Sequence, residues 1–421
     1  MSNLADLAAQ IPDALARLDG VARRTPVHYN ERMSSLTGSQ IWLKREDLQP
    51  VRSYKLRGAY NLMSQLSAEE KAAGVVCPSA GNHGQGVAFA AAALEVHATV
   101  VVPHTTPRQK RQRIMEIGRG WVDLVMHGAT YDEASEEAAR MASEGMTLVP
   151  AFNDPRTAAG QATLMAEAFE QLGFVPDAVL LPVGGGGLLA GSAAWLRTNH
   201  PEVRIIGVEP EGAPCVAAAI SAGRPITLTD IDTFVDGAAV KRVGDVTFEI
   251  IGEAMVELVR VPEGQICTEM LEMYQTEGII AEPAGALAAA ALPTGGLGQR
   301  VQLPTGSRVL VLVSGGNNDV SRYAEVVERS LIHEGRKRYF LVDFPQQPGA
   351  LRTFLDSVLG PDDDITYFEY VKRSSRDTGP ALVGVELGNP NDYRFLLNRI
   401  AESGMKVDEV AYDSPFFRFL I

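Results

Sequence analysis

Apolar runs rich in β-branched residues alternate with Ala-rich helical patterns along most of the chain. The runs at 74–77, 98–102 and 178–182 are each followed by a helical pattern, and a further run at 308–313 indicates a buried strand. Alternation of strand and helix predicts an α/β fold with mostly parallel sheets. In such sheets, ligands bind beyond the carboxyl ends of the strands.

The C-terminal part of the chain follows a different order of elements. Its order is βαββαβ, which predicts a ferredoxin-like α+β domain. A charged stretch at 332–336 separates the two patterns, so we expect one domain over 1–332 and a second over 333–421. The predicted tail elements are strands at 337–344, 365–372, 381–387 and 406–410 and helices at 348–359 and 391–403.

Composition narrows the class of protein. The chain has 421 residues and a formal net charge of −14, which argues against binding to nucleic acid or to anionic membranes. It shows neither a secretory signal pattern nor an apolar stretch long enough to span a bilayer. Its three cysteines are far apart and form no CxxC motif, which is typical of the reducing cytoplasm. We therefore expect a cytoplasmic protein.

Lys55 lies in a segment, 46–58 (EDLQPVRSYKLRG), that could hold an aldehyde cofactor. An aldehyde reacts only with a deprotonated amine, and both partial burial and neighbouring cations such as Arg52 and Arg57 lower the pKa of a lysine. On spacing alone, however, a surface lysine in a basic turn is the better explanation.

Glycine-rich loops follow three of the apolar runs. Residues 79–84 (SAGNHG) would present backbone N–H groups at a helix N-terminus, which suits a substrate carboxylate. Residues 184–188 (GGGGL) would let the backbone approach a phosphate. Ser314 ends the run at 308–313 and could hydrogen-bond a heterocycle nitrogen. Taken singly, the loop at 79–84 is also explained as a capped turn, and the segment that begins at Ser314 as a tight turn.

The second loop permits a different enzyme class. Gly185-x-Gly187-x-x-Ala190 has the form of a dinucleotide-binding fingerprint, and Glu209 follows at the distance which that fingerprint requires. This loop alone does not choose between a nicotinamide-dependent oxidoreductase and an enzyme that binds a phosphate monoester.

Four segments together resemble the serine/threonine dehydratase family of pyridoxal-phosphate enzymes, which have the tryptophan-synthase-β-like fold (fold type II). The matching segments occur in the order of the family, and the resemblance covers residues 6 to 329. It favours a cofactor-binding role for Lys55 over a place in a surface turn. The segments are 53–59 (SYKLRGA), 79–86 (SAGNHGQG), 184–188 (GGGGL) and 314–317 (SGGN).

The resemblance implies a role for each predicted site residue. Lys55 would hold pyridoxal 5'-phosphate and act as a catalytic residue together with Ser79, and Tyr54 would lie against the cofactor. Asn82 would contact the ring hydroxyl, and Ser314 would face the pyridine nitrogen. The cofactor phosphate would bind Gly184, Gly185, Gly186, Gly187 and Leu188, and the substrate carboxylate would bind Ser79, Gly81, Asn82 and His83.

Two side chains refine this chemistry. A neutral serine at 314 does not keep the ring nitrogen protonated, which favours expulsion of a β-leaving group over storage of charge on the ring. Some relatives hold a divalent cation through a Glu, a backbone carbonyl and an Asp. Glu209 and Ala213 could match this set, but Cys215 replaces the Asp, so we expect no metal site.

Residues 338–409 resemble the ACT-like regulatory domain of biosynthetic threonine dehydratases. The resemblance implies conversion of L-threonine to 2-oxobutanoate and ammonia, the first step of isoleucine biosynthesis, in a homo-oligomer for which we favour a tetramer. It also implies inhibition by isoleucine, which valine would oppose. A serine dehydratase, a serine racemase and a non-catalytic amino-acid sensor remain alternatives, and the tail could instead be a structural appendage.

Overall fold

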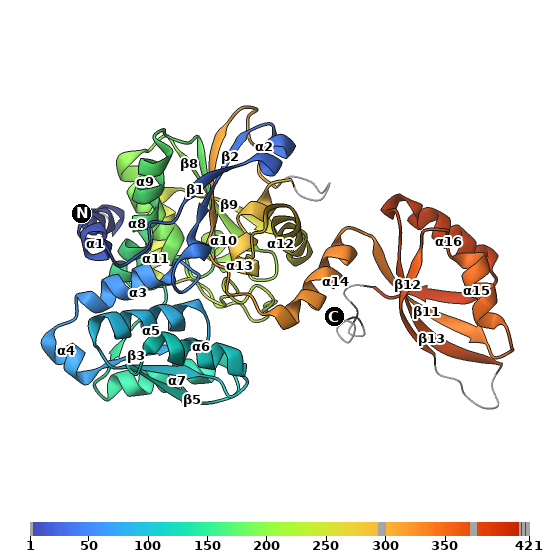
Figure 1. Cartoon of the computed structure of the whole chain (residues 1–421), viewed down its shortest axis with the longest axis horizontal. Coiled ribbons are helices and arrows are strands. Elements are labelled where there is room, and N and C mark those ends of the chain that lie inside the picture. The colour runs from blue at the N-terminus through green and yellow to red at the C-terminus, as the bar shows by residue number, and fades with distance from the viewer. Residues whose placement is uncertain (1–2, 294–299, 371–376, 412–413, 415–416, 418–421) are drawn as a thin grey trace. The chain divides into compact units, whose positions relative to one another are not determined.

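The computed structural model describes residues 3–293, 300–370, 377–411, 414 and 417 (Figure 1). The chain divides into two compact units, Met1–Asp319 and Val320–Ile421. Each unit has a core of its own, so we describe them separately.

The larger sheet of the first unit has six strands in the order β1-β2-β10-β7-β8-β9. Only β1 runs antiparallel to its neighbour, and the other pairs are parallel. The central strands β7 and β10 are almost entirely buried, which explains their continuous apolar sequences. The strands are β1 (Val27–Asn30), β2 (Gln40–Arg45), β7 (Ala178–Pro182), β8 (Arg204–Pro210), β9 (Glu257–Val261) and β10 (Arg308–Val313).

The helices around the larger sheet form the main core of the unit. Ala-rich faces of α8 and α9 pack against each other and against the N-terminal helix α1. Helix α8 shows how the sequence sets its ends: Asp154 caps it, Pro155 begins it, and Gly173 ends it with a φ of 68°. The helices are α1 (Asn3–Leu18), α2 (Glu31–Thr37), α8 (Pro155–Leu172), α9 (Gly187–Asn199), α10 (Cys215–Ala222), α11 (Asp245–Ala254), α12 (Glu263–Glu277) and α13 (Pro283–Ala286).

The smaller sheet of the first unit has four parallel strands in the order β5-β4-β3-β6. Valines of β3 and β4 pack on the Ala-rich helix α5 in a second core. Its strands are β3 (Val75–Pro78), β4 (Ala98–Val102), β5 (Val122–Met126) and β6 (Thr147–Leu148), and its helices are α3 (Lys55–Ser64), α4 (Ala68–Ala73), α5 (Asn82–Leu94), α6 (Arg108–Gly118) and α7 (Tyr131–Ser143). The predicted α/β fold with mostly parallel sheets is confirmed.

The second unit is an antiparallel sheet in the order β12-β13-β11-β14 with α15 and α16 packed on one face (Figure 1). Its elements follow the predicted βαββαβ order. The last two residues of the strand predicted at 365–372 lie outside the described residues. The elements are α14 (Tyr323–His333), β11 (Lys337–Pro345), α15 (Ala350–Val358), β12 (Asp364–Tyr370), β13 (Thr378–Glu386), α16 (Tyr393–Glu402) and β14 (Lys406–Glu409).

Helix α14 lies almost entirely before the boundary that the sequence predicts between residues 332 and 333, yet it groups with the second unit. Glu328 of this helix accepts hydrogen bonds from Lys337 Nζ at 2.5 Å and from the Tyr339 hydroxyl at 2.6 Å. These contacts join α14 to the first strand of the C-terminal sheet. None of the helices in the described part of the chain is long and apolar enough to cross a membrane.

Candidate active site

The Lys55 segment lies against the end of β10. The backbone N–H of Tyr54 donates to the Ser314 carbonyl at 3.2 Å, and the N–H of Gly316 donates to the Arg52 carbonyl at 2.8 Å. Arg52 has a φ of 56°, so the chain turns sharply before helix α3 begins at Lys55. These contacts place the lysine beside a loop that lies about 260 residues later in the sequence.

The amine of Lys55 is suited to react with an aldehyde. Its Nζ donates to the Ala151 carbonyl at 3.3 Å and lies 5.3 Å from the centre of the Tyr54 ring. Burial lowers the pKa of Lys55 to about 8, although the carboxylate of Glu282 opposes this shift. About a tenth of the amine is therefore deprotonated at pH 7, far more than in an unperturbed lysine, and this neutral form is the nucleophile.

Arg57 does not act on Lys55 in the way that the sequence suggests. Its guanidinium donates to both carboxylate oxygens of Glu46, at 2.8 and 2.9 Å, and to Glu167 at 2.9 Å. Lys44 forms a further ion pair with Glu167. This buried network, which sequence reasoning missed, fixes the first turn of α3, and burial is the main cause of the lowered Lys55 pKa.

The glycines at 184–187 let the backbone of the loop pack closely against neighbouring side chains. A Cβ atom at Gly185 would lie 2.4 Å from the Phe152 ring, and one at Gly187 would lie 2.9 Å from the same residue. Gly186 has a φ of 90° and caps helix α9. The loop thus keeps its backbone N–H groups close together at a helix N-terminus, where a phosphate group fits.

Thr247 of α11 fixes this loop from the other side. Its hydroxyl donates to the Gly185 carbonyl at 2.8 Å, and a Cβ atom at Gly186 would lie 2.9 Å from the same hydroxyl oxygen. Neither Thr247 nor Phe152 belongs to a motif, so the sequence alone does not identify them. Both help to hold the glycine loop in a single conformation.

Asn82 begins helix α5 and forms hydrogen bonds at both ends of its amide. Its Nδ2 donates to Oε1 of Glu282 at 2.5 Å, and its Oδ1 accepts from Nδ2 of Asn317 at 2.7 Å. Ser314 is also buried, and its hydroxyl donates to the Ala284 carbonyl at 3.0 Å. Glu282 and Ala284 both belong to the segment that begins α13, another part of the site that the sequence analysis missed.

The loop between β3 and α5 carries the remaining predicted residues. The N–H of Gly81 donates to the Ser79 hydroxyl at 3.3 Å. His83 is buried, and its Nε2 lies 2.7 Å from the Val149 carbonyl. Burial and nearby Lys55 lower the pKa of His83 to about 4, so the neutral ring donates its single proton to Val149. Any contribution of His83 to carboxylate binding therefore comes from its backbone N–H.

A single pocket brings several of these groups together. It is lined by Tyr54, Lys55, Asn82, Gly184 and Ser314. Glu282 lines it as well. The loops contribute from the carboxyl ends of β3, β7 and β10, where an α/β sheet places its ligands. The other predicted residues, Ser79, Gly81, His83, Gly185, Gly186, Gly187 and Leu188, do not line this pocket but lie in the loops that contain Asn82 and Gly184.

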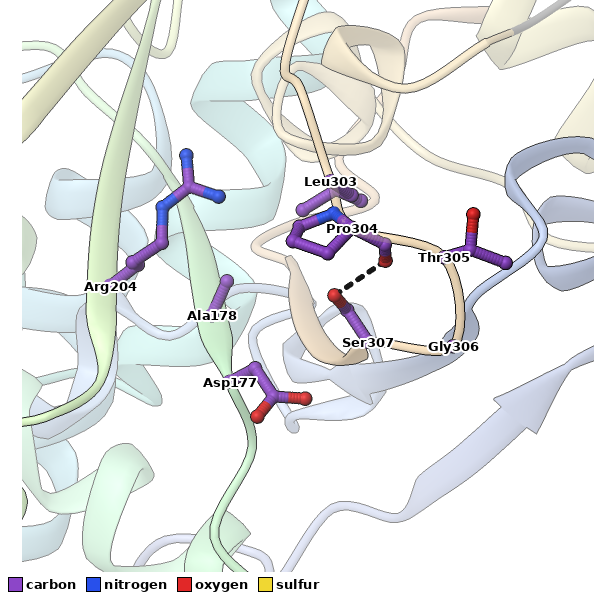
Figure 2. Close-up of a pocket in the computed structure, with 8 residues that line it drawn as sticks. All are labelled: Asp177, Ala178, Arg204, Leu303, Pro304, Thr305, Gly306 and Ser307. Atoms are coloured by element: carbon purple, nitrogen blue, oxygen red, sulfur yellow. Dashed lines mark hydrogen bonds between the residues drawn. The ribbon is translucent and has the colours of Figure 1, made fainter.

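A different pocket lies at the opposite end of the larger sheet (Figure 2). Asp177 and Ala178 are at the start of β7, Arg204 begins β8, and Ser307 directly precedes β10. The Ser307 hydroxyl donates to the Pro304 carbonyl at 2.6 Å, a bond that stays within its own loop (Figure 2). This pocket is at the amino ends of the strands and contains none of the predicted site residues.

The pocket at the carboxyl ends fits pyridoxal phosphate. It offers a lysine amine of lowered pKa, and the glycine loop that reaches it at Gly184 packs too closely on Phe152 to admit a Cβ atom at Gly185. Asn82 and Ser314 place polar groups in the same pocket as the lysine. An aldehyde, a phosphate and a polar heterocycle can each find a partner in this arrangement.

Comparison with known proteins decides the family. Residues 18–315 match pyridoxal-phosphate dependent enzymes, and residues 328–420 match the C-terminal regulatory domain of threonine dehydratase. The biosynthetic L-threonine dehydratase of Mycobacterium tuberculosis is 53% identical over 98% of this chain and 96% of its own length. That of Bacillus subtilis is 46% identical over 95% and 94%. The chain belongs to the biosynthetic threonine dehydratase family.

Solved structures agree with this assignment. The processed form of threonine deaminase isoform 2 from Solanum lycopersicum has a TM-score of 0.71 and 37% identity, and the match covers 77% of this chain and 88% of that one. Maize serine racemase has a TM-score of 0.70 and 29% identity over 77% and 98%. The prediction of a fold type II pyridoxal-phosphate enzyme is confirmed, and the fold is shared by dehydratases and racemases.

Glu209 in this family member does not serve a dinucleotide. Its buried carboxylate accepts hydrogen bonds from the N–H groups of Val216 at 2.7 Å and Ala217 at 2.9 Å, at the start of α10. Burial raises the pKa of Glu209 to about 7. Cys215 directs its thiol to the Gly184 carbonyl at 3.4 Å. With Glu209 engaged by the helix, the nicotinamide alternative loses the acidic residue on which it depends.

Proposed function

We propose that this protein deaminates L-threonine to 2-oxobutanoate and ammonia with pyridoxal phosphate, as the first step of isoleucine synthesis. The observation that carries the proposal is the Lys55 amine, which lies in one pocket with Asn82, Gly184 and Ser314. The near full-length identity to biosynthetic threonine dehydratases supports threonine as the substrate.

Residues of this chain have distinct roles in the proposed reaction. Pyridoxal phosphate, when bound, supplies an electron sink beside the α-carbon of the substrate. Lys55 would hold the cofactor through its Nζ, and its free amine would then serve as the base that takes the α-proton of the substrate. Backbone N–H groups from Gly184 to Leu188 bind the phosphate, and the loop from Ser79 to His83 binds the substrate carboxylate. Tyr54 would lie against the cofactor ring, and the neutral hydroxyl of Ser314 would face the ring nitrogen, which would favour loss of the β-hydroxyl.

The second unit supports a proposal of feedback control. It matches the regulatory domain of threonine dehydratases, and a biosynthetic enzyme gains from inhibition by the end product of its pathway. We propose that isoleucine binds this unit and inhibits the enzyme, that valine opposes isoleucine, and that the protein works as a homotetramer in the cytoplasm. Inhibition by isoleucine bound to the second unit requires a coupling free energy between the isoleucine site and the active site.

Initial rates with L-threonine and L-serine test the substrate. We expect 2-oxobutanoate to form with a higher kcat/KM than pyruvate from serine, and Lys55→Ala to abolish both activities. Because maize serine racemase shares the fold, the same assays should follow D-serine. Racemisation faster than elimination would contradict the proposed function.

Hydrogen exchange of the full chain with and without isoleucine tests the regulation. We expect isoleucine to inhibit threonine turnover and to slow exchange in residues 328–420. Inhibition accompanied by protection only around Lys55 would show that isoleucine competes at the active site, and would contradict a separate regulatory site.

A further inference from the structure

Glu282 is a buried carboxylate for which the chemistry above gives no role. It directly precedes α13 and is 4% exposed. Its backbone N–H donates to the Gly315 carbonyl at 3.1 Å, and its Oε1 lies 2.0 Å from the position of a Cβ atom at Gly315. The carboxylate therefore occupies the space that Gly315, next to Ser314, leaves free.

In the part of the chain that the structure describes, no cation compensates this charge directly. Among the described residues, no Lys, Arg or His nitrogen lies within ion-pair distance of the Glu282 carboxylate. Lys55, Lys110 and Arg52 act on it only from a distance. Burial, with help from nearby Asp236, raises the pKa of Glu282 to about 7. A buried carboxyl group without an ion pair is costly, and an apolar side chain would pack there at lower cost.

The hydrogen bonds of Glu282 show what the carboxyl group provides. Its Oε1 accepts from Asn82 Nδ2 at 2.5 Å, while Asn317 Nδ2 donates to Asn82 Oδ1 at 2.7 Å and to the Val51 carbonyl at 2.8 Å. The two partners together allow only one orientation of the Asn82 amide. One N–H of Asn82 Nδ2 is left over, and Asn82 lines the pocket that contains Lys55.

We propose that Glu282 is a positioning residue that holds the Asn82 amide with its second N–H directed at the ring hydroxyl of pyridoxal phosphate. Without an acceptor at residue 282, only the Asn317 bond to Asn82 Oδ1 holds the amide, and the direction of the free N–H is less firmly fixed. The inference rests on the proposed role of Asn82 at the cofactor ring. It assigns to Glu282 the alignment of the cofactor, and leaves the proton transfers to Lys55.

A matched pair of variants separates the acceptor from the charge. Glu282→Gln keeps an oxygen acceptor of similar length, and Glu282→Met fills the same space without one. The apoenzyme of each is titrated with pyridoxal phosphate, and the visible band of the lysine-bound cofactor gives the Kd. We expect Met to raise the Kd roughly tenfold, and Gln to stay within about threefold of wild type. Unfolding midpoints of the apoenzymes check that both variants fold, and Glu282→Ala replaces Met if Met does not.

A double-mutant cycle tests whether Glu282 acts through Asn82. In the Asn82→Ala background, Glu282→Met should change the Kd by less than about threefold, because the group that it positions is gone. Additive effects of the two substitutions, or a Gln variant as impaired as the Met variant, would overturn the inference. If the wild-type apoenzyme forms no such band at all, both the proposed function and the inference about Glu282 are contradicted. A normal wild-type band with an unaffected Met variant rejects only the role of Glu282.

Discussion

The backbone N–H of Tyr54 donates to the carbonyl of Ser314 over 3.2 Å. Through this bond the lysine segment and the last glycine-rich loop form one wall of the pocket, although they lie far apart in sequence. The relationship explains why Lys55, an unremarkable lysine in its local sequence, takes a half-buried position beside the groups that suit a cofactor.

The first prediction concerns the glycine loop. Gly185→Ala would place a methyl group 2.4 Å from the Phe152 ring, so the loop or the ring must shift. Overpacking of this kind costs about 1–3 kcal/mol, and we expect the Kd for pyridoxal phosphate to rise roughly tenfold. Titration of the apoenzyme with pyridoxal phosphate measures this Kd.

Gly252→Ala in helix α11 is the matched control, because a methyl group there meets no atom within 4 Å. We expect this control to bind the cofactor like wild type and to be slightly stabilised. Equal affinities in the two variants would show that the backbone at Gly185 does not hold the phosphate.

The second prediction concerns pH. Only the deprotonated amine of Lys55 reacts with the cofactor aldehyde, and burial lowers its pKa to about 8. The rate at which apoenzyme takes up pyridoxal phosphate should therefore rise with pH through about 8 and then level off. Stopped-flow absorbance measures this rate. A rate that keeps climbing towards pH 10, as an unperturbed lysine would give, would refute the burial of the amine.

The third prediction concerns the ion network under α3. Arg57→Met leaves the fully buried carboxylate of Glu46 without its main partner, and the loss of one member of such a pair costs about 3–5 kcal/mol. Urea unfolding of the apoenzyme should show this decrease in the free energy of unfolding. The control is Arg242→Met, which breaks an exposed pair with Asp245 and should change little. A small effect of Arg57→Met would mean that the network does not stabilise this region.

Local pattern was sufficient to predict most of the fold. The runs at 98–102, 178–182 and 308–313 coincide with β4, β7 and β10, because strands buried on both faces require continuous apolar sequence. The order of the C-terminal elements was likewise visible in strand and helix periodicity. Helix α14 was harder to assign, since it groups with the tail through tertiary contacts, among them those of Glu328 and Ile332, that no local pattern indicates.

The candidate site was predictable only where residues form motifs. Glycine loops and Lys55 have recognisable neighbours in sequence, whereas Phe152, Thr247 and Glu282 act by contacts with residues far along the chain. Arg57 illustrates the same limit, because its adjacency to Lys55 suggested an electrostatic role. The tertiary structure instead pairs it with Glu46, and no local pattern indicates that partner.

The central claim is that Lys55 holds the cofactor. Borohydride reduction of the loaded full-length enzyme fixes the cofactor to its lysine, and peptide mass spectrometry then locates it. The account predicts that the label is found on the peptide that contains Lys55, and that the Lys55→Ala protein carries none. A label on another lysine, with turnover of threonine intact in Lys55→Ala, would contradict it.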